Sequence, residues 1–170
     1  ITPSEQHPTL GWLPAEDSLD ARGALTVQGA PLDPQQTIAL FGDSYTAGTT
    51  PAGTRISDAL QRLRPQAQIL NFGVGGYGLD QILLRLEDRL GVLNPGDQGL
   101  IGVLTTDLDR TILPLRDAPK PWFSLSSAGD LTLHPPAQGS TTQWFSDHPI
   151  AATSLLWRRL IRTAQLQSAR

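Results

Sequence analysis

The sequence predicts an α/β fold with a parallel sheet. Three short, mainly apolar runs, residues 38–41, 69–72 and 100–104, are typical of strands buried on both faces. Helical patterns lie between them, so the order is strand, helix, strand, helix, strand. This alternation favours parallel strands joined by right-handed crossovers. The length of 170 residues suits a single domain.

Residues 1–35 precede this pattern and are predicted to form an irregular N-terminal arm. Prolines interrupt every potential helix there. They are Pro3, Pro8, Pro14, Pro31 and Pro34. Trp12 and Leu13 are expected to hold the arm against the body, because such an apolar pair is costly to leave in water.

Residues 36–110 form the predicted α/β core. Its first helix is indicated by Ile56, Leu60 and Leu63 at helical spacing and is stopped by Pro65. Its second helix is amphipathic, with apolar residues at 82, 83, 86 and 90, and Gly91 is its expected stop.

Residues 111–170 are expected to form a β-hairpin and a helix, either as the end of this single domain or as an insertion into it. Apolar-rich residues 122–125 and 131–133 flank a turn-forming segment, which predicts the hairpin. Residues 151–167 are predicted to be helical, with leucines inward and arginines in solvent.

The third predicted strand would leave an apolar edge if it is the last of the sheet. Such an edge must be covered or paired. The candidates are the hairpin, a second copy in a dimer, and a C-terminal portion beyond Arg170.

Composition excludes several classes of function. The net charge of −3 and the pI near 5.5 do not indicate the basic surface that general nucleic-acid binding requires. The absence of cysteine excludes disulfides, thiolate nucleophiles and cysteine-based metal sites, and the three histidines lack the spacing of a zinc protease. No apolar run approaches the ~20 residues of a membrane span.

The chain begins at Ile1 and contains no methionine. We interpret it as a processed product or an excised piece, with any signal peptide or anchor outside it.

Three loops should meet at the carboxyl edge of the sheet, where open α/β sheets bind ligands. They are residues 42–44, 73–78 and 105–107. The first loop places Ser44 on a sharp turn after a buried strand, with its backbone N–H near a helix start. Ser44 also has a simpler interpretation, as part of an Asx turn or helix cap.

The motifs GDSYTAG at 42–48 and NFGVGGYGLDQ at 71–81 together resemble the SGNH (GDSL) hydrolase superfamily. The closest likeness is to branches that act on carbohydrate O-acyl groups, and it covers about residues 36–110. The resemblance implies a flavodoxin-like, three-layer α/β/α sheet, here incomplete. It also implies an ester hydrolase or acyl-transfer domain that needs no cofactor or metal.

The resemblance assigns roles to three positions. Ser44 matches the nucleophile, and its N–H and that of Gly76 match the oxyanion hole. The third motif is altered, with Leu104 in place of glycine and Thr106 in place of asparagine. A threonine hydroxyl reaches less far than an asparagine amide, and loss of one oxyanion donor costs about 3 kcal/mol in the transition state.

A base must accept the serine proton. His148 is our candidate, because the Pro149 and predicted helix that follow it resemble the segment after the family's base. The residue three before it is a phenylalanine rather than the expected aspartate, and the adjacent Asp147 would point away. His134 and His7 are the alternatives, as is a D-x-x-H motif beyond the end of this chain.

The sequence thus predicts a serine-dependent esterase or acyl-transfer domain acting on short O-acyl groups of a carbohydrate, in an extracytoplasmic location suggested by the family. A second hypothesis is a catalytically inactive SGNH-like domain that binds glycans or a protein. A third is a dinucleotide binder, since residues 73–78 fit G-x-G-x-x-G. The acidic pair Asp107 and Asp109 is interpreted as a strand-end cap with Arg110 as its partner.

Overall fold

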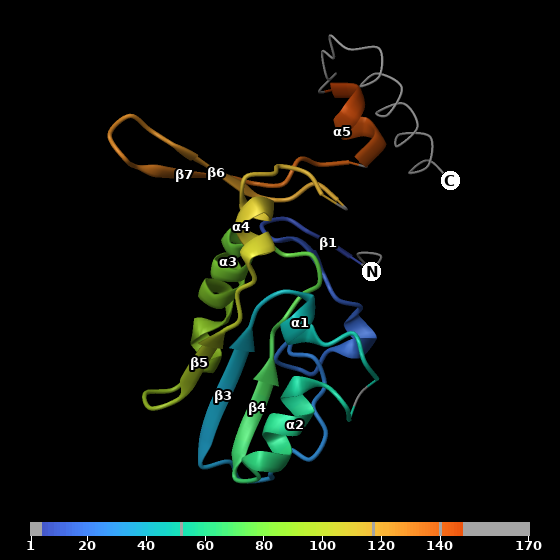
Figure 1. Ribbon diagram of the computed structural model, residues 1–170, viewed down its shortest axis with the longest axis vertical. Coiled ribbons are helices and arrows are strands. Elements are labelled where there is room, and N and C mark those ends of the chain that lie inside the picture. The colour runs from blue at the N-terminus through green and yellow to red at the C-terminus, as the bar shows by residue number, and fades with distance from the viewer. Residues whose placement is uncertain (1–4, 52, 117, 140, 148–170) are drawn as a thin grey trace.

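The computed structural model describes residues 5–51, 53–116, 118–139 and 141–147. Its centre is a parallel three-stranded sheet in the order β4-β3-β5, with β3 in the middle. The strands are β3 (Gln36–Phe41), β4 (Ala67–Asn71) and β5 (Gln98–Ile101). This confirms a mixed α/β fold with a parallel sheet (Figure 1).

The helices that join the strands cover opposite faces of the sheet. Side chains of β3 alternate between the faces. Ala39 and Phe41 pack with Ile82 of α3 (Leu79–Arg89), whereas Ile38 and Leu40 pack with α2 (Ile56–Leu63). A short 3-10 turn, η2 (Leu90–Val92), ends α3. Both predicted core helices are confirmed.

The fully buried side chains of α2 are polar, and Leu60 is a partly buried apolar residue that packs against the sheet. Ser57, Asp58 and Gln61 are buried there, while Ile56 and Leu63 are exposed. Gln61 accounts for this orientation, because its amide donates to Ala67 O at 2.8 Å and accepts from Ile69 N at 3.1 Å. The apolar spacing therefore predicts this helix but not the face that it buries.

The third strand differs from the prediction of a buried strand at 100–104. β5 ends at Ile101, and all four of its residues are exposed. Leu100 and Ile101 are 47% and 50% exposed because β5 pairs only with β3 and no other described strand continues the sheet. The apolar edge is therefore present.

The N-terminal arm is more regular than predicted. It contains an antiparallel pair, β1 (Glu5–His7) and β2 (Gly11–Leu13), and a 3-10 turn, η1 (Glu16–Ser18). Trp12 is only 4% exposed, so the predicted attachment of the arm through Trp12 is confirmed.

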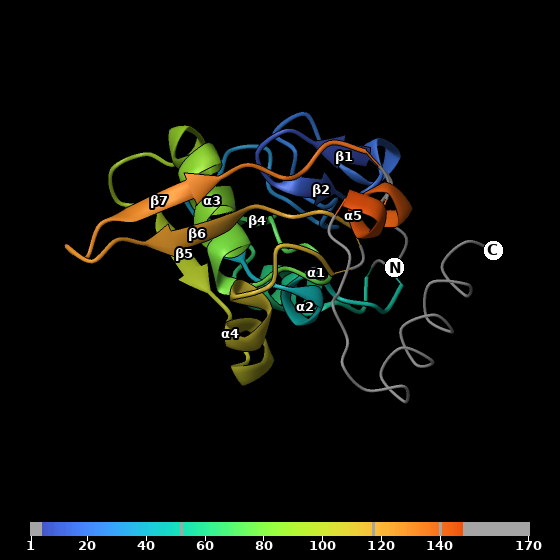
Figure 2. The ribbon, with the colours of Figure 1, turned by 90° about the horizontal axis from the view of Figure 1, so that it is seen from above.

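The predicted hairpin is confirmed as β6 (Trp122–Leu125) and β7 (Leu131–His134). It forms a separate two-stranded sheet and does not pair with β5. It projects from the end of the molecule that carries α4 (Thr105–Thr111), with α5 (Thr141–Asp147) on the other side in Figures 1 and 2. The helix predicted at 151–167 lies outside the described residues.

Candidate active site

The three loops predicted to form the site leave the same edge of the sheet side by side. Gly102 N donates to Phe41 O at 2.8 Å, and Val74 N donates to Gly42 O at 3.0 Å. The first loop leads into α1 (Ser44–Ala47), the second into α3 and the third into α4. Figure 1 shows α1 and α4 beyond the carboxyl ends of the strands.

Close backbone contacts fix α1 against the end of β4. A Cβ on Gly73 would overlap the backbone of Thr46 and Ala47. The Asn71 side chain donates to Thr46 O at 2.8 Å and accepts from Gly73 N at 3.0 Å. Glycine and asparagine at these positions therefore set the short helix that begins with Ser44.

Ser44 is partly exposed at the start of α1. The neighbouring Asp43 is the helix cap, since its carboxylate accepts from Tyr45 N at 2.9 Å. The Ser44 hydroxyl contacts only Asp43 Oδ2 within the described residues, at 3.5 Å. The Asx-turn role thus belongs to Asp43. The Ser44 hydroxyl forms no short hydrogen bond within the described residues.

Gly76 lies in the turn after β4, with a φ of 86° that favours glycine. Its N–H donates no hydrogen bond within the described part of the chain. The N-terminal arm holds the turn on both sides of this glycine: Trp12 Nε1 donates to Gly75 O at 3.1 Å, and the Tyr77 hydroxyl donates to Trp12 O at 2.5 Å. Burial raises the pKa of the Tyr77 hydroxyl above its usual value.

Arg110 connects the loops. Its Nη1 lies 3.0 Å from Asp43 Oδ2, 3.2 Å from Tyr77 O and 2.7 Å from Asp107 Oδ1. Asp43, next to Ser44, and Tyr77, next to Gly76, therefore bind the same nitrogen. This contact holds the two loops together at the carboxyl edge of the sheet.

Asp107 has the predicted cap role. Its carboxylate accepts from Leu104 N at 2.8 Å at the start of α4 and pairs with Arg110. Burial and the nearby Asp43 carboxylate raise the pKa of Asp107, and the Leu104 N–H and the Arg110 charge oppose that shift.

The structure does not bring Thr106 into this arrangement. Its side chain is exposed on α4 and forms no hydrogen bond among the described residues. Because Asp107 turns inward to cap α4, the residue before it faces solvent. The third loop reaches the site through Arg110 instead.

The described histidines lie in other contacts. His7 Nδ1 accepts from Leu10 N at 3.1 Å, and burial lowers its pKa. His134 stacks on Trp122 in the hairpin, and its Nε2 is 2.8 Å from Ser124 Oγ. His148 lies outside the described residues, so the base remains a sequence prediction.

Sequence reasoning missed two interactions near the site. One is the ion pair between Arg110 and Asp43. The sequence indicates only that Arg110, three residues after Asp107 on a helix, can pair with Asp107. The other is an ion pair between Lys120 and Asp80, both buried, in which Lys120 Nζ also donates to Pro121 O at 2.9 Å. This pair attaches the segment before the hairpin to the first turn of α3.

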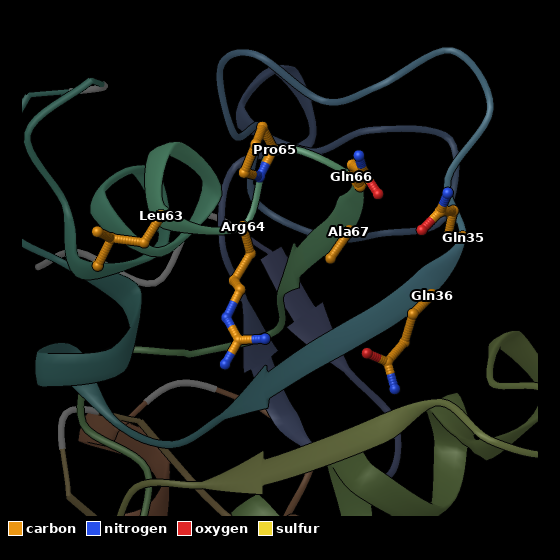
Figure 3. Close-up of a pocket in the computed structure, with 7 residues that line it drawn as sticks. All are labelled: Gln35, Gln36, Leu63, Arg64, Pro65, Gln66 and Ala67. Carbon is orange, nitrogen blue, oxygen red and sulfur yellow. The ribbon is translucent and has the colours of Figure 1, made fainter.

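A cavity of about 370 Å³ lies at the opposite end of the sheet, away from Ser44. It is lined by the end of α2 and by the first residues of β3 and β4 (Figure 3). Residues 5–51, 53–116, 118–139 and 141–147 contain no group of three or more His, Asp or Glu side chains that could hold a metal. The same residues include no helix long and apolar enough to cross a membrane.

Comparisons with protein-family models, with curated proteins and with solved structures each found no match to this chain.

Proposed function

We propose that this chain is a serine-dependent ester hydrolase or acyl-transfer domain of the SGNH type, acting on short O-acyl groups of a carbohydrate. The observation that carries the proposal is Ser44, a partly exposed residue at the carboxyl edge of the sheet whose hydroxyl has one long contact among the described residues, to Asp43 Oδ2 at 3.5 Å. The glycine turn, which Arg110 connects to the Ser44 loop, contains Gly76, a buried residue whose N–H has no described acceptor.

The strand order supports the family assignment. The sheet order is β4-β3-β5, so the second strand of this sheet along the chain lies beside the first, and the third lies on the other side of the first. The flavodoxin-like order 2-1-3-4-5 begins in the same way, and its ligand site is at the switch point beside the first strand. Ser44 follows that central first strand, β3.

In the proposed reaction, Ser44 Oγ attacks the ester carbonyl carbon while the base, His148 in our assignment, accepts the hydroxyl proton. The backbone N–H groups of Ser44 and Gly76 stabilise the tetrahedral oxyanion. Its collapse breaks the bond to the carbohydrate oxygen, which takes the proton from the base. Water or an acceptor hydroxyl then gives its proton to the base and attacks the acyl-serine carbonyl. The bond to Ser44 Oγ breaks, the acyl group leaves as an acid or a new ester, and Oγ takes the proton from the base.

A catalytically inactive domain that binds glycans or a protein is the second candidate. It is favoured by the positions of His7 and His134, which are engaged away from Ser44, and by the solvent-facing Thr106.

The dinucleotide hypothesis gains no support from the glycine loop. A pyrophosphate would need free N–H groups at the start of α3. Those of Gly78, Leu79 and Gln81 already donate to side chains. Asp97 accepts from Thr37 N, near the start of β3 and away from the carboxyl edge.

Hydrolysis of p-nitrophenyl acetate by the folded chain tests the enzyme proposal. We expect turnover that disappears in Ser44→Ala and persists in Thr49→Ala, which removes an exposed hydroxyl from the same loop. Absence of turnover by the folded wild-type chain, or equal rates in wild type and Ser44→Ala, would overturn it. Binding of acetylated against deacetylated polysaccharide would then test the second candidate.

A further inference from the structure

Arg110 is the side chain from the third loop that reaches the candidate site. It lies four residues after Thr106 on α4, and its side chain is 17% exposed. Ser44 Oγ and Arg110 Nη1 approach the same oxygen, Asp43 Oδ2, at 3.5 Å and 3.0 Å. The guanidinium is therefore one carboxylate away from the serine hydroxyl.

The contacts of Arg110 join three separate segments. Asp43 belongs to the loop before α1, Tyr77 to the glycine loop and Asp107 to α4. An NH₂ group has two hydrogens, so these three acceptors share them around one nitrogen. A change at this nitrogen would move the residues next to Ser44 and Gly76 together.

The charges make this contact hard to replace. The Asp43 and Asp107 carboxyl groups are both buried, and the guanidinium is the cation that pairs with both of them. Without it, two carboxyl groups would face each other in a partly dry environment, which disfavours their joint ionisation. Asp43 would then lose the contact that orients its Oδ2 beneath Ser44.

We propose that Arg110 is a positioning residue that sets the geometry between the Ser44 hydroxyl and the Gly76 N–H. The inference rests on the proposed function and assigns the contribution of the third loop to Arg110 rather than to Thr106. Arg110 acts through Asp43 and the Tyr77 carbonyl, without touching the substrate.

The test compares three variants: Arg110→Lys, Arg110→Met, and a double variant that carries both Arg110→Met and Asp107→Asn. The double variant also removes one of the two facing carboxylate charges, so that the fold is retained. Arg64→Met, on the cavity at the other end of the sheet, is the control. We expect the double variant to lose about 10²-fold in kcat with KM little changed, since small misplacements of reacting groups have effects of that size. Arg110→Lys should recover part of the loss.

Amide hydrogen exchange supplies a readout that does not depend on activity. Exchange should become faster in both 43–48 and 73–78 in the double variant and stay unchanged in Arg64→Met. Unchanged exchange in these loops, or an unchanged kcat in an active enzyme, would overturn the positioning role. An inactive wild-type chain that still shows the coupled exchange would overturn the proposed function alone.

Discussion

Asp43 and Arg110 form an ion pair with 3.0 Å between Oδ2 and Nη1, although 67 residues separate them in the chain. Asp43 also caps α1 through Tyr45 N. One buried carboxylate thus connects the start of the helix that carries Ser44 to α4. This connection, together with the Tyr77 carbonyl, defines the rim at which we place the site.

Gly73 provides a test of how closely the glycine loop contacts α1. Replacing it with alanine should cost about 1–3 kcal/mol, because the added methyl group would overlap the Thr46–Ala47 backbone. Gly91→Ala is the matched control, since a Cβ there meets nothing within 4 Å. Urea unfolding would measure both changes, and equal stabilities of the two variants would contradict the close contact.

The ion pair between Lys120 and Asp80 should be essential to stability. Lys120→Met leaves a buried carboxylate without its cation, for which a loss of about 3–5 kcal/mol is expected. The double variant Lys120→Met with Asp80→Asn should be less destabilised, because no unpaired charge remains. Chemical denaturation of both variants checks this, and a Lys120→Met variant within 1 kcal/mol of wild type would contradict a buried pair.

Asp58 should make the free energy of unfolding depend on pH in the acidic range. Burial opposes its ionisation, but backbone N–H groups of Arg55, Gln28 and Gly53 donate to the carboxylate, and with the Arg55 charge they lower its pKa below the usual value. The resulting stability is present above the unfolded pKa of about 3.9 and is lost as pH falls through the lower folded pKa.

Asp58→Asn should therefore destabilise the chain at neutral pH by about 1–3 kcal/mol and weaken its acid sensitivity. Thermal unfolding between neutral pH and pH 3, with exposed Asp33→Asn as the control, measures both effects. An equal slope with pH in wild type and Asp58→Asn would show that Asp58 is not the responsible group.

The parts predicted well from the sequence depend on local patterns. The apolar run at 38–41 identifies β3, where all four of these residues are buried, and the apolar residues at helical spacing around Ile82 identify α3. The pattern locates α3 but not its whole buried face, since Leu83 is exposed whereas Gln81 and Arg85 are buried. The turn signals between Trp122 and Leu133 likewise locate the hairpin.

The parts missed depend on contacts between distant segments. The buried polar face of α2 exists because Gln61 bonds to β4, and the exposure of β5 reflects the absence of a further described strand beside it. Arg110 was expected only as the partner of Asp107, since its contact with Asp43 requires the folded arrangement of two loops.

The open edge of β5 leads to a prediction about association. A strand with unpaired backbone groups and exposed apolar side chains tends to pair with another chain. We expect concentration-dependent self-association in sedimentation velocity, reduced by Ile101→Lys but not by Leu32→Lys, which changes a fully exposed leucine outside β5. A monomer at all concentrations, or equal effects of the two substitutions, would exclude pairing through β5.

Reaction with a fluorophosphonate probe, followed by peptide mass spectrometry, tests the account most directly, because such probes modify an activated serine. We expect a single adduct on Ser44, absent in Ser44→Ala and formed more slowly in the Arg110→Met, Asp107→Asn variant. A folded wild-type chain that acquires no adduct, or acquires it at another residue, would contradict the assignment of Ser44 as a nucleophile.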